Sequence, residues 1–146
     1  DLPRHPGHEK RSVKVVKKLA SRLPVPNNCR DLGLLTAEYH SHCHRALELK
    51  ASTVLKVLNQ TDAFRRPERF ERFLLVCEAD SCGRTGLEDR PYPQADYFRG
   101  AHRVAANVHI EDLKSGELAG AEIGRKIGKR RLDAISTFRA SYEPPK

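Results

Sequence analysis

Apolar residues recur along this chain at intervals of three and four, and no stretch of useful length alternates apolar with polar residues. The first pattern places side chains on one face of an α-helix, whereas alternation is typical of a half-buried strand. The first such segment runs from His8 and is stopped by Pro24 and Pro26, because proline cannot continue a helix. Its apolar face is expected to join the core. The sequence therefore predicts an all-α fold, a compact multi-helix array.

Later boundaries can be predicted from single residues. Asn27 or Asn28 is expected to cap the second helix, and Pro67 suits the first turn of a fourth, after a short third one. The loop GLEDRPYPQ precedes two more helices, the last of which begins near Gly120. Helices before residues 65–67 carry most of the histidines and helices after them most of the arginines, so we predict an internal boundary there.

The charge of the chain points to a polyanionic partner. With 27 Lys and Arg residues against 19 Asp and Glu residues, the formal charge is +8 and the pI is near 9.6. Nucleic acid is the first partner to expect, although a helical scaffold domain can carry the same charge. No apolar run approaches the roughly 20 residues of a membrane span, so no membrane partner is expected.

Cysteine usage favours a cytoplasmic protein. The four cysteines form no CxxC pair and no zinc-finger spacing, and nothing resembles a secretory segment. Reduced thiols are the simplest interpretation, and disulfides are not predicted.

Histidines concentrate in RHPGH at the start and in YHSHCH near the end of the second helix. At 100° per residue, His40 and His44 share a helix face, so a two-imidazole metal clamp is geometrically open to them, completed by His8 or His5. The alternative is that these are solvated or capping histidines. No catalytic serine motif or phosphate-binding glycine loop accompanies them.

Several longer segments resemble one known family, in the same order along the chain. They are RHPGHEKRSVKVV, AEYHSHCH, QTDAFRRPERFE, CEADSCGRTGLEDRPYPQADYF and GAEIGRKIGKRRLDAI. Together they resemble the C-terminal region of bacterial CCA-adding tRNA nucleotidyltransferases of the multifunctional type. The resemblance covers nearly the whole chain and implies a fragment of a longer enzyme.

The resemblance also implies a division of labour. Residues 1–66 would be the C-terminal part of an HD-type phosphohydrolase-like domain, and residues 67–146 a helical tRNA-binding tail. The family's head, which uses magnesium with ATP and CTP to add CCA to tRNA ends, has no counterpart here, so this fragment should carry no catalytic residues for polymerisation and be inactive alone. Nickel or another divalent metal is implied for the HD domain. The resemblance leaves room for a homo-oligomer.

Particular residues follow from matching the family's motifs. His8 matches a histidine of an HxGH-like turn, and His40 matches the histidine of a Phe-His-Asp motif, in which Ser41 replaces the aspartate. A neutral hydroxyl is a poor ligand for metals that imidazole favours, so the replacement weakens the site. Asp62 would be a final acidic ligand or would orient one.

The tail supplies the predicted RNA-binding residues: Arg84, Arg125, Lys129, Arg130 and Arg131. Their clustering favours a tRNA-binding fragment. Paired histidines would favour the alternative of a metal-dependent phosphohydrolase module acting on 2′,3′-cyclic phosphates, and an exposed apolar helix face would favour a scaffold.

Overall fold

The computed structural model describes residues 7–83, 85–108 and 120–144. Within these ranges the chain is all-helical and contains no strand, as the sequence predicts. The elements in order are α1 (His8–Arg22), α2 (Asn27–His44), the 3₁₀ helix η1 (Ala46–Glu48), α3 (Ala51–Gln60), α4 (Pro67–Cys82), α5 (Pro93–Ala106) and α6 (Gly120–Ser141). None of these helices is long and apolar enough to cross a membrane.

Proline sets several of the helix boundaries. Pro67 and Pro93 each lie in the first turn of a helix, where the missing N–H would have no partner in any case. The expectation that Asn27 or Asn28 caps α2 is wrong, because both asparagines lie inside the helix and the extended Pro26 occupies the capping position. The Asn28 side chain still acts in the first turn, where its Oδ1 accepts the N–H of Cys29 at 3.0 Å.

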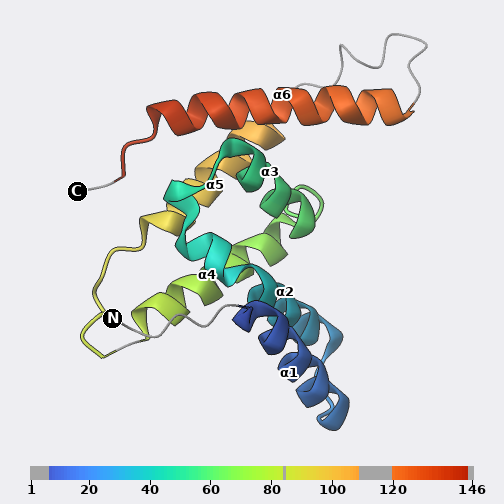
Figure 1. The fold of residues 1–146 in the computed structure, drawn as a ribbon, viewed down its shortest axis with the longest axis vertical. Coiled ribbons are helices and arrows are strands. Elements are labelled where there is room, and N and C mark those ends of the chain that lie inside the picture. Colours follow the sequence, from blue (N-terminus) through green and yellow to red (C-terminus); the bar gives the residue numbers. More distant parts are fainter. Residues whose placement is uncertain (1–6, 84, 109–119, 145–146) are drawn as a thin grey trace.

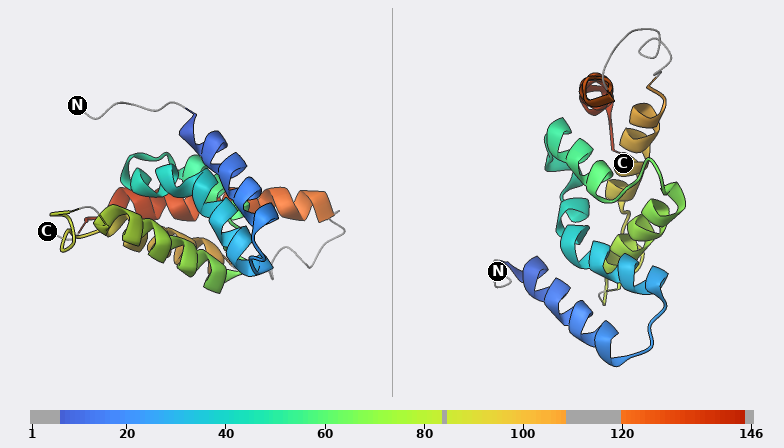
Figure 2. Two further views of the ribbon diagram at one scale, coloured as in Figure 1. Left: turned by 90° about the horizontal axis from the view of Figure 1, so that it is seen from below. Right: turned by 90° about the vertical axis from the view of Figure 1, so that its right-hand side faces the viewer.

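Figure 1 shows α6 lying across one end of the molecule, on α5 and α3, while α1 and α2 form a helical hairpin at the other end. In the right-hand view of Figure 2 α6 is seen end-on beside α3 and α5. The core connects these layers. Its largest fully buried side chains include Tyr97, Phe73, Phe98, Leu58, Leu74 and Ile135. One core therefore runs from α2 to α6, across the boundary predicted near residue 66.

Helix α1 differs from the expectation that one of its faces joins the core. It contains no buried residue: Val13, Val16 and Ala20 on the expected face are half-buried, and Val15 and Leu19 beside them are at least half exposed. Its packing partner is α2. The amphipathic pattern predicts the helix, but within the described part of the chain α2 covers the apolar residues of α1 only in part.

The turn between α3 and α4 has a fixed geometry. Thr61 is fully buried, and its hydroxyl donates to the carbonyl of Val57 at 2.8 Å. Asp62 follows with φ of 56°, a left-handed conformation that Asp tolerates better than most residues. Its carbonyl accepts the backbone N–H groups of Arg65 and Arg66. This turn leads directly into the arginine-rich beginning of α4.

Candidate nucleic-acid interface and histidine pair

The basic side chains predicted to bind RNA lie largely along the first half of α6. Arg125 and Lys129 are exposed and four residues apart, so they project from nearly the same side of the helix. Lys126, between them, pairs with Glu122 at 3.6 Å. Arg130 is half-buried. The predicted Arg84 lies outside the described residues. The predicted residues that the structure describes therefore form a basic ridge on α6.

Arg131 joins this ridge to the rest of the fold. Its guanidinium carbon lies 3.7 Å from the ring centroid of Phe64, which belongs to the turn between α3 and α4. Burial lowers the pKa of the Arg131 guanidinium, and its Nε atom is buried without a hydrogen-bond partner. A cation held over an aromatic face in this way is worth about 0.5–2 kcal/mol. Arg131 thus anchors α6 beside the start of α4.

At the opposite end of the molecule, α1 and α2 bring two histidines together. The Nε2 atoms of His8 and His40 lie 3.2 Å apart, and the Ser41 hydroxyl lies 3.2 Å from Nε2 of His8. His40 Nδ1 lies 2.9 Å from the Thr36 carbonyl, which fixes the ring so that Nε2 points toward His8. Histidines 32 residues apart in sequence therefore share one site.

This pair fits part of a metal site. Two imidazole nitrogens bound at about 2.0–2.1 Å to one tetrahedral ion lie about 3.4 Å apart, close to the observed separation. The third neighbour is the neutral hydroxyl of Ser41. Among the residues that the structure describes, no three His, Cys, Asp or Glu side chains are arranged to hold a metal ion. The described residues thus supply two imidazoles, one ligand short of a usual catalytic site, and His5 lies outside them.

Asp62, the third predicted ligand, is engaged elsewhere. Its carboxylate lies between 3.5 and 3.9 Å from the guanidinium groups of Arg65, Arg66 and Arg69. Its role at a metal stays a prediction, and the contacts that it makes here are with arginines.

His44 has partners that the sequence did not indicate. Its Nδ1 lies 2.8 Å from the Tyr92 hydroxyl, and its Nε2 lies 2.9 Å from Oδ2 of Asp80. Although the rings of His40 and His44 are neighbours, with centroids 5.7 Å apart, both nitrogens of His44 are thus occupied. The Tyr92 hydroxyl also donates to the buried Cys43 sulfur at 3.5 Å. In place of the His40/His44 clamp that helix geometry left open, His44 forms a link between α2, α4 and the start of α5.

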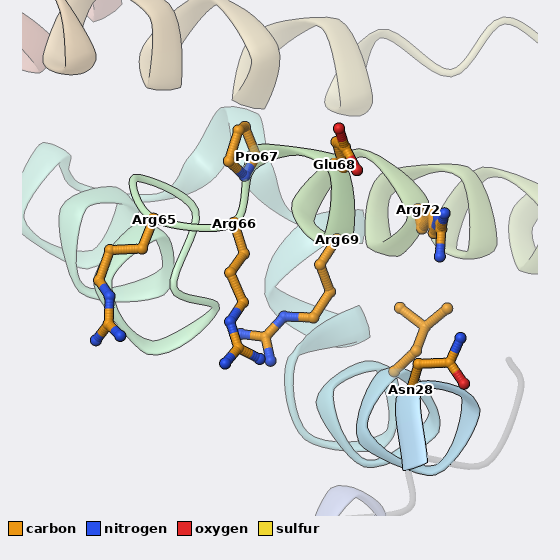
Figure 3. Close-up of a pocket in the computed structure, with 8 residues that line it drawn as sticks. Asn28, Arg65, Arg66, Pro67, Glu68, Arg69 and Arg72 are labelled. Carbon is orange, nitrogen blue, oxygen red and sulfur yellow. The ribbon is translucent and has the colours of Figure 1, made fainter. Parts of the chain in front are cut away.

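A second group of basic residues was missed by the sequence analysis. Four arginines around Pro67 line a pocket of about 410 Å³ against the beginning of α2: Arg65, Arg66, Arg69 and Arg72. Figure 3 shows Arg65, Arg66 and Arg69 extending to one side, with Arg72 further along the same helix. The signal was present in RRPERFER, since residues 66, 69 and 72 recur at intervals of three on a helix that begins at 67.

Fold and site together define a basic, all-helical module with a histidine pair between α1 and α2 and with clustered cationic side chains on α6 and at the start of α4. No protein-family profile and no solved structure matches the chain. It is 52% identical over 141 residues to the multifunctional CCA protein of Thioalkalivibrio sulfidiphilus, covering 97% of this chain and 34% of that one. The chain belongs to the family of the multifunctional CCA proteins.

Other members of the family are similar to the chain to nearly the same degree. The multifunctional CCA proteins of Pseudomonas fluorescens and Hahella chejuensis are 46% and 45% identical to the chain, each over 144 residues or 99% of its length. The chain spans about a third of the length of these relatives, 35% and 34% respectively. The resemblance noted from the sequence motifs is thereby confirmed.

Proposed function

We propose that this chain is the tRNA-binding part of a CCA-adding tRNA nucleotidyltransferase, an enzyme that adds and repairs the 3′-terminal CCA of tRNA. The observation that carries the proposal is that nearly the whole of this chain matches multifunctional CCA proteins. The exposed basic ridge on α6 gives it a physical basis, because a polyanion needs cations that are not already neutralised.

The binding mode follows from the kind of side chains involved. Arg125 and Lys129 are exposed at one edge of a rigid helix, and Lys126 and Arg130 flank them. Cations in such a row contact phosphates and not base edges, so the grip should follow the shape of folded RNA and tolerate any sequence. Arg131 contributes by holding α6 against Phe64.

Nucleotide transfer itself is assigned to the remaining two thirds of the relatives' length. Magnesium with ATP and CTP would act there, and the task of the present chain is to hold the tRNA. We place the enzyme in the cytoplasm.

A tRNA titration at several salt concentrations tests the proposal. The logarithm of the affinity should fall with the logarithm of the salt concentration, with a slope of about −0.7 to −0.9 per phosphate neutralised. Replacing Arg125 and Lys129 with Gln should reduce both affinity and slope. Lys10 and Lys14 on α1, also exposed and four residues apart, give a matched control whose replacement should leave both nearly unchanged. A slope near zero for the wild type would refute tRNA binding.

The histidine pair favours a second candidate function, that of a metal-dependent phosphohydrolase. His8 and His40 would hold nickel or another divalent ion, with Asp62 as a further ligand. With two imidazoles and the neutral Ser41 hydroxyl in place, we expect weak nickel or zinc binding and no hydrolysis of 2′,3′-cyclic nucleotides by the chain alone.

Calorimetry with nickel distinguishes the arrangements. Weak binding that is lost in His8→Ala and in His40→Ala but survives in His44→Ala would place the ion on the pair. Tight one-to-one binding, or hydrolysis of the cyclic phosphate, would mean that the site is more complete than these contacts indicate.

A further inference from the structure

The pocket at the turn between α3 and α4 carries more positive than negative side chains. Four guanidinium groups line it, from Arg65, Arg66, Arg69 and Arg72. The negative charges nearby are those of Asp62 and Glu68, and in Figure 3 Glu68 lies on the other side of the helix from the arginine side chains. Even with both carboxylates counted, two positive charges remain uncompensated.

Several donors in this pocket are not used by the protein. Arg72 makes no hydrogen bond or ion pair with any described residue. Arg69 donates from Nη2 to the Thr61 carbonyl at 2.9 Å, but its Nε is buried without a partner. Arg65 and Arg66 approach Asp62 no closer than 3.7 and 3.5 Å, beyond a good hydrogen bond. The exposed guanidinium groups are available to an anion in exchange for water, and the buried Nε of Arg69 has no protein partner.

Backbone dipoles add to the positive electrostatic potential of the pocket. Asn28, near the start of α2, lines the pocket opposite the arginines, and Pro67 begins α4 on its other wall. The first turns of both helices thus lie at the pocket. Free N–H groups and the partial positive charge at a helix start favour anions.

The turn that carries the pocket's arginines is also joined to α6. Phe64, whose ring supports Arg131, is directly followed by Arg65 and Arg66 in the same turn. Basic side chains of α6 and of the beginning of α4 therefore lie on either side of one turn. Two such groups of cations suit an anion with repeated charges better than a single small ion.

We propose that this pocket binds a phosphate group of the RNA backbone, so that the chain holds tRNA at α6 and at the start of α4 together. The inference rests on the proposed tRNA binding and adds a second contact to it. The planar guanidinium fork of arginine matches phosphate oxygens, and the cavity volume lies within the usual range of ligand pockets.

The test uses Arg72→Gln, because Arg72 supports no other described residue and its replacement should leave the fold intact. Its matched control is Arg45→Gln, which removes the same charge at the other end of α2, about 25 Å from Asn28 along the helix. Affinity for tRNA is measured across salt concentrations for both variants and the wild type. Circular dichroism confirms folding.

Arg72→Gln should make the salt slope shallower by about 0.7–0.9, the share of one phosphate. The ratio of wild-type to variant affinity should then shrink about threefold between about 50 and about 200 mM salt. Arg45→Gln should keep the wild-type slope. An Arg72→Gln slope equal to that of the wild type overturns the pocket as an RNA contact.

Two further readouts separate the sources of failure. If replacing Arg125 and Lys129 weakens tRNA binding and Arg72→Gln does not, only the pocket proposal falls, whereas a wild-type slope near zero removes the proposed function as well. Inorganic phosphate is titrated against the Nε–H resonances of Arg69 and Arg72. If phosphate shifts them while the tRNA slope of Arg72→Gln is unchanged, the pocket takes free phosphate and the RNA proposal is wrong.

Discussion

Replacing Gly100 with alanine should destabilise the chain, although alanine is the better helix former. Gly100 lies in the middle of α5, and an added Cβ would meet Cζ of Phe138 on α6 and lie 2.8 Å from its Cε2. Overpacking of this kind costs about 1–3 kcal/mol, while Gly→Ala in a helix interior gains about 0.8–1.0 kcal/mol. We expect a net loss of about 1 kcal/mol, within about 0 to 2 kcal/mol, measured by urea unfolding.

A double-mutant cycle isolates the contact. In a chain that also carries Phe138→Ala, the clash is absent, so Gly100→Ala should stabilise by about 0.8–1.0 kcal/mol. Gly128→Ala in α6 is the control, since nothing lies within 4 Å of a Cβ there, and it should stabilise by a similar amount in both backgrounds. If Gly100→Ala stabilises the wild type as much as Gly128→Ala does, the close approach of α5 and α6 is not as described.

Three other outcomes follow from the structure. Burial lowers the pKa of His102 in the folded chain, so at a pH below the usual histidine pKa of about 6.5 the unfolded chain binds more protons than the folded one. The free energy of unfolding should therefore fall as the pH drops below that value. His102→Gln should make this fall less steep in urea titrations. Arg99→Gln, which removes ion pairs to Glu71 and Asp96, should cost about 1 kcal/mol or less in the same assay, since these groups are partly exposed. Asp62→Asn removes a negative charge beside the arginine pocket, and asparagine can adopt the left-handed conformation of this turn. The variant should bind tRNA up to about fivefold tighter at low salt, and weaker binding would contradict the pocket's role.

The helices could be predicted because their signals are local. Pro67 begins α4 and Gly120 begins α6, as the positions of proline and glycine indicated. The apolar spacing of α1 identified a helix, but whether its face finds a partner depends on distant surface, and Leu19 stays half exposed.

The site was less accessible to sequence reasoning, because side-chain partners are fixed by tertiary contacts. Periodicity placed His40 and His44 on one side of α2, yet His40 meets His8 and His44 meets Asp80 and Tyr92. Those partners lie 32 to 48 residues away along the chain. Only the assembled helices bring them together.

Amide hydrogen exchange with and without tRNA tests most directly whether this chain holds tRNA through α6. Binding to the ridge and the arginine pocket should slow exchange in α6 and in the turn between α3 and α4, because bound RNA suppresses local opening of the helices that it contacts. Exchange in α1, at the far end of the molecule, should not change. Protection confined to α1 and α2, or no protection at all at saturating tRNA, would contradict the account.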